Sequence, residues 1–485
     1  MMRAITADRR RGRRGERIGW VHSAGAARRR GWGMPGWALA VAAAGLLACG
    51  PALAGAHVLA RRPPMGWNSW DAYGKTLTEA QFRANVRWMA KHLRRYGWRY
   101  AVIDAGWSVS GGGARAGVLT MDRYGRYLPV PDHFPSAAGG RGFGPLAHYV
   151  HSLGLKFGIH IMRGIPKEAV SANLPIAGSP FHARQAADLH APCSWDPHND
   201  GVADNAAGQA YYDSIVRLYA RWHVDFIKVD CISSRPYAAA DIRMLAQAMR
   251  AAGRPIVISL SPGPTPLDKL AQLRRDANMW RISNDVWDLW RSTSAFPQGV
   301  ANQFAPLARW APLARPGHWP DADMFAIGYL GPHPGLGEAR WSRLTHAEQR
   351  TYMTLWCIAR SPLMIGANLT RMNRWTLSLL DNRAVIAVDQ DATDAHQVLA
   401  RHRFVVWMSR PQRGGGWYLA AFNLAGRART LKLPWRALSL PGKRYRLREL
   451  WQRRSLGSAG ALRVRLAAHG SLLYRLRRVP AAARG

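Results

Sequence analysis

The chain has 485 residues, which is enough for two or three domains. Hydrophobic residues make up 48% and charged residues 20%, a composition that excludes a disordered chain and indicates a globular protein with a large core. Lys and Arg number 68 against 29 Asp and Glu, for a formal net charge of +39. Such a charge suits nucleic acid, but no zinc-finger spacing, RNA-binding motif or phosphate-binding glycine loop accompanies it. Nearly all of the basic residues are Arg, as is typical of a GC-rich coding sequence, and we expect no nucleic-acid partner.

The N-terminal segment has the order of a secretory signal. Three arginines at 28–30 precede an apolar run over 37–54, which ends in the small-residue pattern Ala-Leu-Ala at 52–54. Cys49 lies in a stretch that resembles a lipoprotein cleavage site, so a lipid anchor there is an alternative to simple cleavage. We expect residues 1–56 to be a leader and the protein to be exported, either periplasmic or extracellular. No later apolar run approaches the roughly 20 residues that span a bilayer.

Three cysteines follow this leader, and an odd number can form at most one disulfide within the chain. Cys193 and Cys231 are the candidates for a disulfide in an oxidising compartment. Cys357 lies in an apolar helical pattern, and we expect it to be a buried thiol.

Short apolar runs rich in β-branched residues alternate with amphipathic helical patterns over most of the chain. Eight runs predict strands, at 66–70, 100–106, 156–161, 224–230, 255–261, 279–285, just before 323, and at 362–368. Helical patterns occur at 78–97, 207–223 and 240–253. Strands that alternate with helices predict parallel βα units, and eight such units predict an α/β protein with a (β/α)8 TIM barrel over residues 57–392.

From about residue 395 the pattern changes to short strands separated by Gly and Pro turns. These runs lie at 403–409, 416–424, 429–435, 444–450 and 471–479. Because no helical pattern separates them, we expect a small C-terminal antiparallel β-sandwich domain over 393–485. No long low-complexity linker precedes it, so the two domains should pack closely.

Several of the predicted barrel strands end in a carboxylate or lead to one. These carboxylates are Asp104, Asp230, Asp285 and the pair Asp321 and Asp323. A helix cap or a turn explains any single one. In a TIM barrel, however, the carboxyl ends of the strands face the catalytic mouth, so a set of carboxylates there should converge. Carboxylates interspersed with tryptophans suit a neutral sugar, whose apolar face stacks on an aromatic ring while its hydroxyls bind the carboxylates.

Four motifs, in order, resemble glycoside hydrolase family 27, the melibiase-like family of retaining α-galactosidases and α-N-acetylgalactosaminidases. They are PPMGWNSWDAYG at 63–74, FIKVD at 226–230, WRISNDVWD at 280–288 and GHWPDADM at 317–324. The resemblance extends from about residue 60 to 478. It implies an enzyme without a cofactor or a metal, and the histidines do not have metal-ligand spacing.

The resemblance also implies roles for individual residues. Asp230 matches the nucleophile and Asp285 the acid/base of a double-displacement reaction. Lys228 lies on the same strand face as Asp230, where it would keep that carboxylate ionised and bind a sugar hydroxyl; a structural ion pair is the alternative. The implied substrate-binding residues are Trp70, Asp104, His160, Lys228, Ser261, Arg281 and Asp323.

Three positions depart from the family pattern. Ala105 stands where many members have a second Asp that contacts galactose near its 4- and 6-hydroxyls. His160 replaces a common Tyr, and Ser261 stands where galactosidases often have an acidic residue near the 2-hydroxyl.

These departures leave the substrate open. We rank α-galactosidase first, acting on oligo- or polysaccharides. The alternatives are a β-L-arabinopyranosidase, because Ala105 suits a pentopyranose without a hydroxymethyl arm, and an α-N-acetylgalactosaminidase, because Ser261 leaves room for an acetamido group. A non-catalytic carbohydrate-binding protein is the alternative from another class, and the presence of both Asp230 and Asp285 argues against it.

Overall fold

The computed structural model describes residues 58–110 and 117–480 of the 485-residue chain. The predicted leader at 1–56, with Cys49, lies outside the described residues. Among the helices that are described, none is both long enough and apolar enough to cross a membrane.

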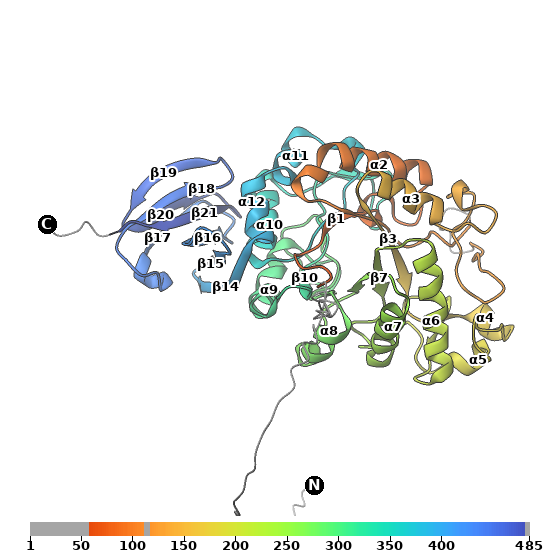
Figure 1. The fold of residues 1–485 in the computed structure, drawn as a ribbon. Helices are drawn as coiled ribbons and strands as arrows, with labels where there is room; N and C mark the ends of the chain where they lie inside the picture. Colours follow the sequence, from red (N-terminus) through yellow and green to blue (C-terminus); the bar gives the residue numbers. More distant parts are fainter. Residues whose placement is uncertain (1–57, 111–116, 481–485) are drawn as a thin grey trace, which may run out of the picture. The chain divides into compact units, whose positions relative to one another are not determined.

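Eight parallel strands form one curled sheet in the order β10-β9-β8-β7-β3-β2-β1-β13 (Figure 1). They are β1 (Met65–Asn68), β2 (Tyr100–Ile103), β3 (Lys156–Met162), β7 (Phe226–Asp230), β8 (Val257–Leu260), β9 (Met279–Arg281), β10 (Trp319–Asp321) and β13 (Leu363–Ile365). A parallel bridge between Phe325, just after β10, and Ile365 joins the two edges of the sheet. All eight predicted strands and the TIM-barrel fold are confirmed.

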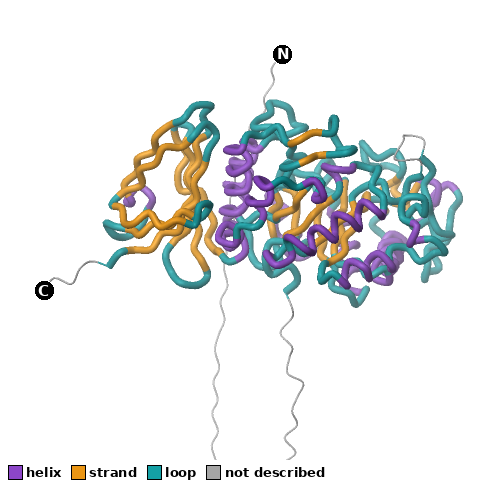
Figure 2. The backbone as a smooth tube through the Cα atoms, turned by 90° about the horizontal axis from the view of Figure 1, so that it is seen from above, coloured by secondary structure: helices purple, strands orange, loops and turns teal. Residues whose placement is uncertain are grey.

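Helices surround these strands (Figure 2). Helix α2 (Glu79–His92) begins at a capping box, in which Thr78 Oγ1 accepts from the backbone N–H of Gln81 and the Gln81 side chain accepts from the N–H of Thr78. The patterns at 207–223 and 240–253 form α6 (Ala206–Arg221) and α7 (Ala239–Ala251). The other barrel helices of seven or more residues are α3 (Gly144–Ser152), α8 (Leu270–Asp276), α9 (Phe304–Trp310), α10 (His346–Ala359), α11 (Arg374–Leu380) and α12 (Arg383–Gln390).

An insertion between β3 and α6 was not predicted. Its elements are β4 (Ile165–Pro166), α4 (Lys167–Ser171), α5 (Ala183–Ala186), β5 (Ala187–Asp188) and β6 (Asn199–Val202), and its strands form a small antiparallel sheet in the order β4-β6-β5. A disulfide between Cys193 and Cys231 ties the insertion to the residue that follows β7. The predicted disulfide is therefore confirmed, and Cys357 is a buried free thiol, as expected.

The C-terminal domain is an antiparallel β-sandwich, as predicted. One sheet contains β14 (Ala392–Arg401), β15 (Phe404–Pro411), β16 (Trp417–Asn423), β21 (Ser471–Arg478), β18 (Tyr445–Glu449) and β19 (Arg454–Ala459), and β17 (Arg429–Pro434) pairs with β20 (Ala461–Leu466) in the other. The domain has its own apolar core. It packs on the barrel, as expected, because Thr351 Oγ1 on α10 donates to the carbonyl of His469 at 2.7 Å and Phe304 contacts Phe422 edge to face. The boundary between residues 392 and 393 stays a prediction.

Candidate active site

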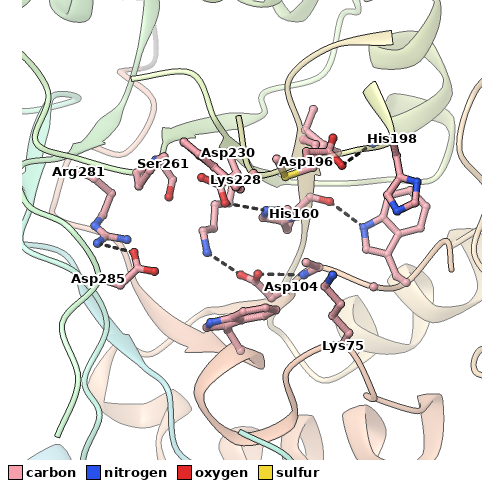
Figure 3. A pocket seen from close by; sticks show the side chains of 18 of the residues that line it. Lys75, Asp104, His160, Asp196, His198, Lys228, Asp230, Ser261, Arg281 and Asp285 are labelled. Atoms are coloured by element: carbon pink, nitrogen blue, oxygen red, sulfur yellow. Dashed lines mark hydrogen bonds and ion pairs between the residues drawn. The ribbon is translucent and has the colours of Figure 1, made fainter. Parts of the chain in front are cut away.

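A cavity of about 850 Å³ lies at the carboxyl ends of the barrel strands (Figure 3). Every residue predicted for catalysis or substrate binding lines it, namely Trp70, Asp104, His160, Lys228, Asp230, Ser261, Arg281, Asp285 and Asp323. These side chains come from positions more than 250 residues apart in the chain, from Trp70 to Asp323. The barrel topology alone brings them together.

Asp230 is the last residue of β7 and faces the cavity with Lys228. His160 is on the neighbouring strand β3, and its Nε2 lies 3.5 Å from Asp230 Oδ2. The backbone N–H of Cys231 donates to Asp230 Oδ1 at 2.9 Å. Burial raises the pKa of Asp230, but the hydrogen bond and charge of His160, the charge of Lys228 and the N–H of Cys231 together lower it below its usual value. The carboxylate is thus kept ionised, as a nucleophile requires.

Lys228 makes its direct contact with Asp104, at the end of β2. Its Nζ lies 2.8 Å from Asp104 Oδ2, and Asn68 Nδ2 donates to the same oxygen at 2.6 Å. Burial raises the pKa of Asp104, but the charges of Lys228 and His160 hold it well below its usual range. The structural ion pair considered for Lys228 is therefore present. The charge of Lys228 also lowers the pKa of Asp230. Lys228 can therefore form the ion pair with Asp104 and help to keep Asp230 ionised at the same time.

Arg281 binds two carboxylates, those of Asp285 and Asp323. Figure 3 shows Arg281 and Asp285 on the side of the site away from Asp196 and His198. Its Nη2 lies 3.0 Å from Asp285 Oδ1 and its Nη1 lies 2.8 Å from Asp323 Oδ1. The backbone N–H of Val286 donates to Asp323 Oδ2 at 2.7 Å. Burial raises the pKa of Asp323 to about 7, against the opposing charge of Arg281.

Asp285 differs from its neighbours in exposure. Its side chain is 37% exposed, whereas those of Arg281 and Asp323 are 3% exposed. An acid/base must reach both the leaving oxygen and a water molecule. Asp285 is oriented by Arg281 yet open to the cavity, which suits that role, while Asp323 is better placed to orient Arg281 and the sugar.

Other residues at this end of the barrel are structural. Asp288 pairs with Arg340 at 2.6 Å, and Asp321 Oδ1 accepts from the backbone N–H of Asp323 at 2.9 Å. Within residues 58–110 and 117–480, no group of three or more His, Cys, Asp or Glu side chains is arranged to hold a metal ion. Asp230 and Asp285 are the two carboxylates at this cavity that the sequence predicts to carry the reaction.

Part of the cavity wall is formed by side chains that were not among the predicted site residues. Lys75, Trp195, Asp196, His198 and Phe296 also line the cavity. Three of them lie in the insertion that the disulfide ties to Cys231. The cysteine pair could have indicated that this segment lies near the site. Cys231 directly follows Asp230, and Cys193 precedes Trp195 by two residues, so a bond between the cysteines brings Trp195 close to Asp230.

Comparison with known proteins agrees with this geometry. The family description "Alpha galactosidase A" matches residues 198–391, and "Alpha galactosidase C-terminal beta sandwich domain" matches residues 402–476. The crystal structure of a family 27 β-L-arabinopyranosidase from Geobacillus stearothermophilus is 43% identical, covers 88% of this chain and 98% of its own, and aligns with a TM-score of 0.83. This chain belongs to glycoside hydrolase family 27.

Two other relatives have lower identity to this chain. The structure of a putative α-N-acetylgalactosaminidase from Bacillus halodurans is 37% identical, covers 87% of this chain and 100% of its own, and has a TM-score of 0.76. An α-galactosidase from Oryza sativa subsp. japonica is 26% identical, over 86% of this chain and 85% of its own. The chain is thus a glycosidase rather than a non-catalytic carbohydrate-binding protein.

Proposed function

We propose that this family 27 enzyme is a β-L-arabinopyranosidase, which removes terminal β-L-arabinopyranosyl residues from oligo- or polysaccharides. The α-galactosidase activity that we ranked first has weaker support, because the rice α-galactosidase is 26% identical and the Geobacillus β-L-arabinopyranosidase 43%. A variant of the Geobacillus enzyme has also been crystallised in complex with arabinose.

The observation that carries the proposal is Ala105. It lines the cavity next to Asp104, and its backbone N–H donates to Asp104 Oδ1 at 2.9 Å. Gly106 has a φ of +96°, and a Cβ there would lie 2.7 Å from Lys75 Cα, so this turn is closely packed and Ala105 has a defined position. The Ala105 methyl group offers no polar atom to a hydroxymethyl arm. L-arabinopyranose has the ring stereochemistry of galactose without that arm.

The reaction uses the carboxylates of Asp230 and Asp285, which both line the cavity. Asp230 attacks the anomeric carbon while Asp285 gives its proton to the glycosidic oxygen, so that a bond to Asp230 forms as the bond to the leaving group breaks. Water, deprotonated by Asp285, then attacks the same carbon and breaks its bond to Asp230. The sugar leaves with its original anomeric configuration.

A second candidate is α-N-acetylgalactosaminidase. Ser261 follows β8 and lines the cavity, and its side chain is smaller than an acidic one, which favours a sugar with an acetamido group at that position. The similarity to the Bacillus halodurans protein supports this candidate. The proline-rich residues 262–264 that follow Ser261 do not resemble that subfamily.

We also propose that the enzyme acts after export. The leader pattern at 1–56 supports this, and so does the disulfide between Cys193 and Cys231, because disulfides persist in oxidising compartments. The alternative to cleavage of the leader and release of the protein is a lipid anchor on Cys49, which would keep the exported protein at a membrane surface.

Three substrates test the proposed activity. The protein from residue 57 onward is assayed on p-nitrophenyl β-L-arabinopyranoside, α-D-galactopyranoside and α-N-acetyl-D-galactosaminide. We expect kcat/KM to be at least about tenfold higher for the arabinopyranoside, because one lost or gained hydroxyl contact changes transition-state binding by roughly that factor. A preference for the galactoside or the galactosaminide would reject the proposal in favour of that activity.

A further inference from the structure

Exposed aromatic side chains are rare in the part of the chain that the structure describes, and they are concentrated at the active site. In residues 58–110 and 117–480 they are Trp195 at 44%, Phe296 at 51% and Trp341 at 44% exposure. Trp195 and Phe296 line the active-site cavity, whereas Trp341 does not. Large exposed apolar side chains at a cavity usually mark a surface that binds a ligand, because their exposure to water does not contribute to the stability of the fold.

Trp195 is held close to Asp230. Two residues before it, Cys193 is bonded to Cys231, the residue after Asp230. One residue after it, Asp196 Oδ1 accepts from the backbone N–H of His198 at 3.1 Å. The exposed indole ring is therefore carried by a segment that is fixed on both sides.

Phe296 is held close to Asp285 in a comparable way. It lies in the loop between Asp285 and Gln298. The two ends of this loop are close together, because the N–H of Gln298 donates to the carbonyl of Asp285 at 2.8 Å. The N–H of Trp287 donates to the carbonyl of Gln298 at 2.9 Å, which closes the base of the loop. Figure 3 shows Asp285 and Asp196, the neighbour of Trp195, on opposite sides of the site. Trp195 and Phe296 thus reach the cavity from two different loops, one tied to the residue after Asp230 and the other closed on Asp285.

The cavity has room for more than the sugar that is released. At about 850 Å³ it lies in the upper part of the range that drug-sized ligands occupy, and a single pentopyranose is much smaller. The polar groups that bind the released sugar are clustered around Asp104, Lys228 and Asp230. The leaving group must lie beside Asp285, which protonates its oxygen, and this is where the loop with Phe296 begins.

We propose that Trp195 and Phe296 form the binding site for the leaving group, and that this leaving group is a neutral sugar ring. The C–H groups on the face of a pyranose stack on aromatic rings, while a leaving group without a ring gains nothing from them. This inference rests on the proposed function for the identity of the released sugar. It adds which side chains bind the sugar to which the β-L-arabinopyranosyl unit is linked.

Two substrates with the same released sugar test it. One is a β-L-arabinopyranosyl disaccharide, whose leaving group is a sugar, and the other is β-L-arabinopyranosyl fluoride, whose leaving group is a single ion. For Trp195→Ala and for Phe296→Ala we expect kcat/KM on the disaccharide to fall roughly fivefold to tenfold, with kcat/KM on the fluoride unchanged within about twofold. Trp341→Ala, at the same 44% exposure as Trp195 but outside the cavity on β12 (Arg340–Trp341), is the matched control and should change neither rate.

The outcomes separate this inference from the proposed function. Equal losses on both substrates would mean that the variants disturb the catalytic site or the fold, and no loss on either would mean that the rings do not contact the leaving group; both results overturn the inference. If the wild-type protein hydrolyses neither substrate but does hydrolyse α-galactosyl fluoride, the proposed function fails. In that case the variants are compared on an α-galactosyl disaccharide and on α-galactosyl fluoride. A fall in kcat/KM on the disaccharide alone would then still show that Trp195 and Phe296 bind the leaving group.

Discussion

Replacing Ala105 with Asp should move the preference of the enzyme toward α-galactosides. The new carboxylate would stand beside Asp104 in the cavity wall, where we propose that the carbon beyond the sugar ring of a galactoside would lie. A hydrogen bond to a charged group contributes about 1.5 to 3 kcal/mol. Because about 1.4 kcal/mol corresponds to a tenfold change, kcat/KM on p-nitrophenyl α-D-galactopyranoside should rise roughly 10- to 100-fold.

On the arabinopyranoside the same change should be harmful. A pentopyranose has no hydroxyl to pair with the new carboxylate, and covering that charge with a bound sugar that offers it no partner costs about 1 to 3 kcal/mol. The ratio of the two kcat/KM values should therefore change by roughly 100-fold or more. Ala105→Asn is the control, since it adds similar volume without the charge. An unchanged ratio, or an equal fall for both substrates in Ala105→Asp, would refute the role given to this position.

Three further changes test the rest of the site. Asp230→Ala should lower kcat by a factor on the order of 10⁴ without changing the melting temperature, and an active variant would exclude Asp230 as the nucleophile. His160→Phe removes the hydrogen bond that lowers the pKa of Asp230, so that carboxylate should take up its proton at a higher pH, and the acid limb of the kcat/KM profile should move upward; a downward shift would contradict this. Lys228→Met leaves Asp104 buried without its ion pair, so the free energy of unfolding in urea should fall by about 3 kcal/mol, and an unchanged value would show that the pair contributes no stability.

The barrel was predictable because its strands are short runs rich in apolar residues that alternate with helical patterns. Residues 226–230, for example, combine β-branched and aromatic residues with polar side chains only at the positions that face the cavity. The insertion between β3 and α6 has no such signal. Its strands have two to four residues, too short to show a period of two, and its position depends on the bond between Cys193 and Cys231. Strand β19 was missed because its side chains are almost all exposed and lack alternation.

The residues predicted for the site all line one cavity, but the sequence did not predict the contacts between them. The sequence placed Asp285 and Asp323 in the site, but it did not indicate that the single guanidinium of Arg281 binds both. Trp195 and Phe296 lie in loops without a regular pattern, and only tertiary contacts bring them to the cavity. The sequence alone did not separate the candidate substrates, because Ala105 suits a pentopyranose while the four motifs are shared with α-galactosidases.

The anomeric configuration of the first product tests the central claim most directly. The hydrolysis of a β-L-arabinopyranoside by the wild-type protein is followed by ¹H NMR, fast enough to precede mutarotation. Attack by Asp230 followed by water predicts that β-L-arabinopyranose appears first and the α anomer only later. If the α anomer appears first, the mechanism inverts and Asp230 is not a nucleophile. If no arabinose is released while an α-galactoside is cleaved, the proposed substrate is wrong.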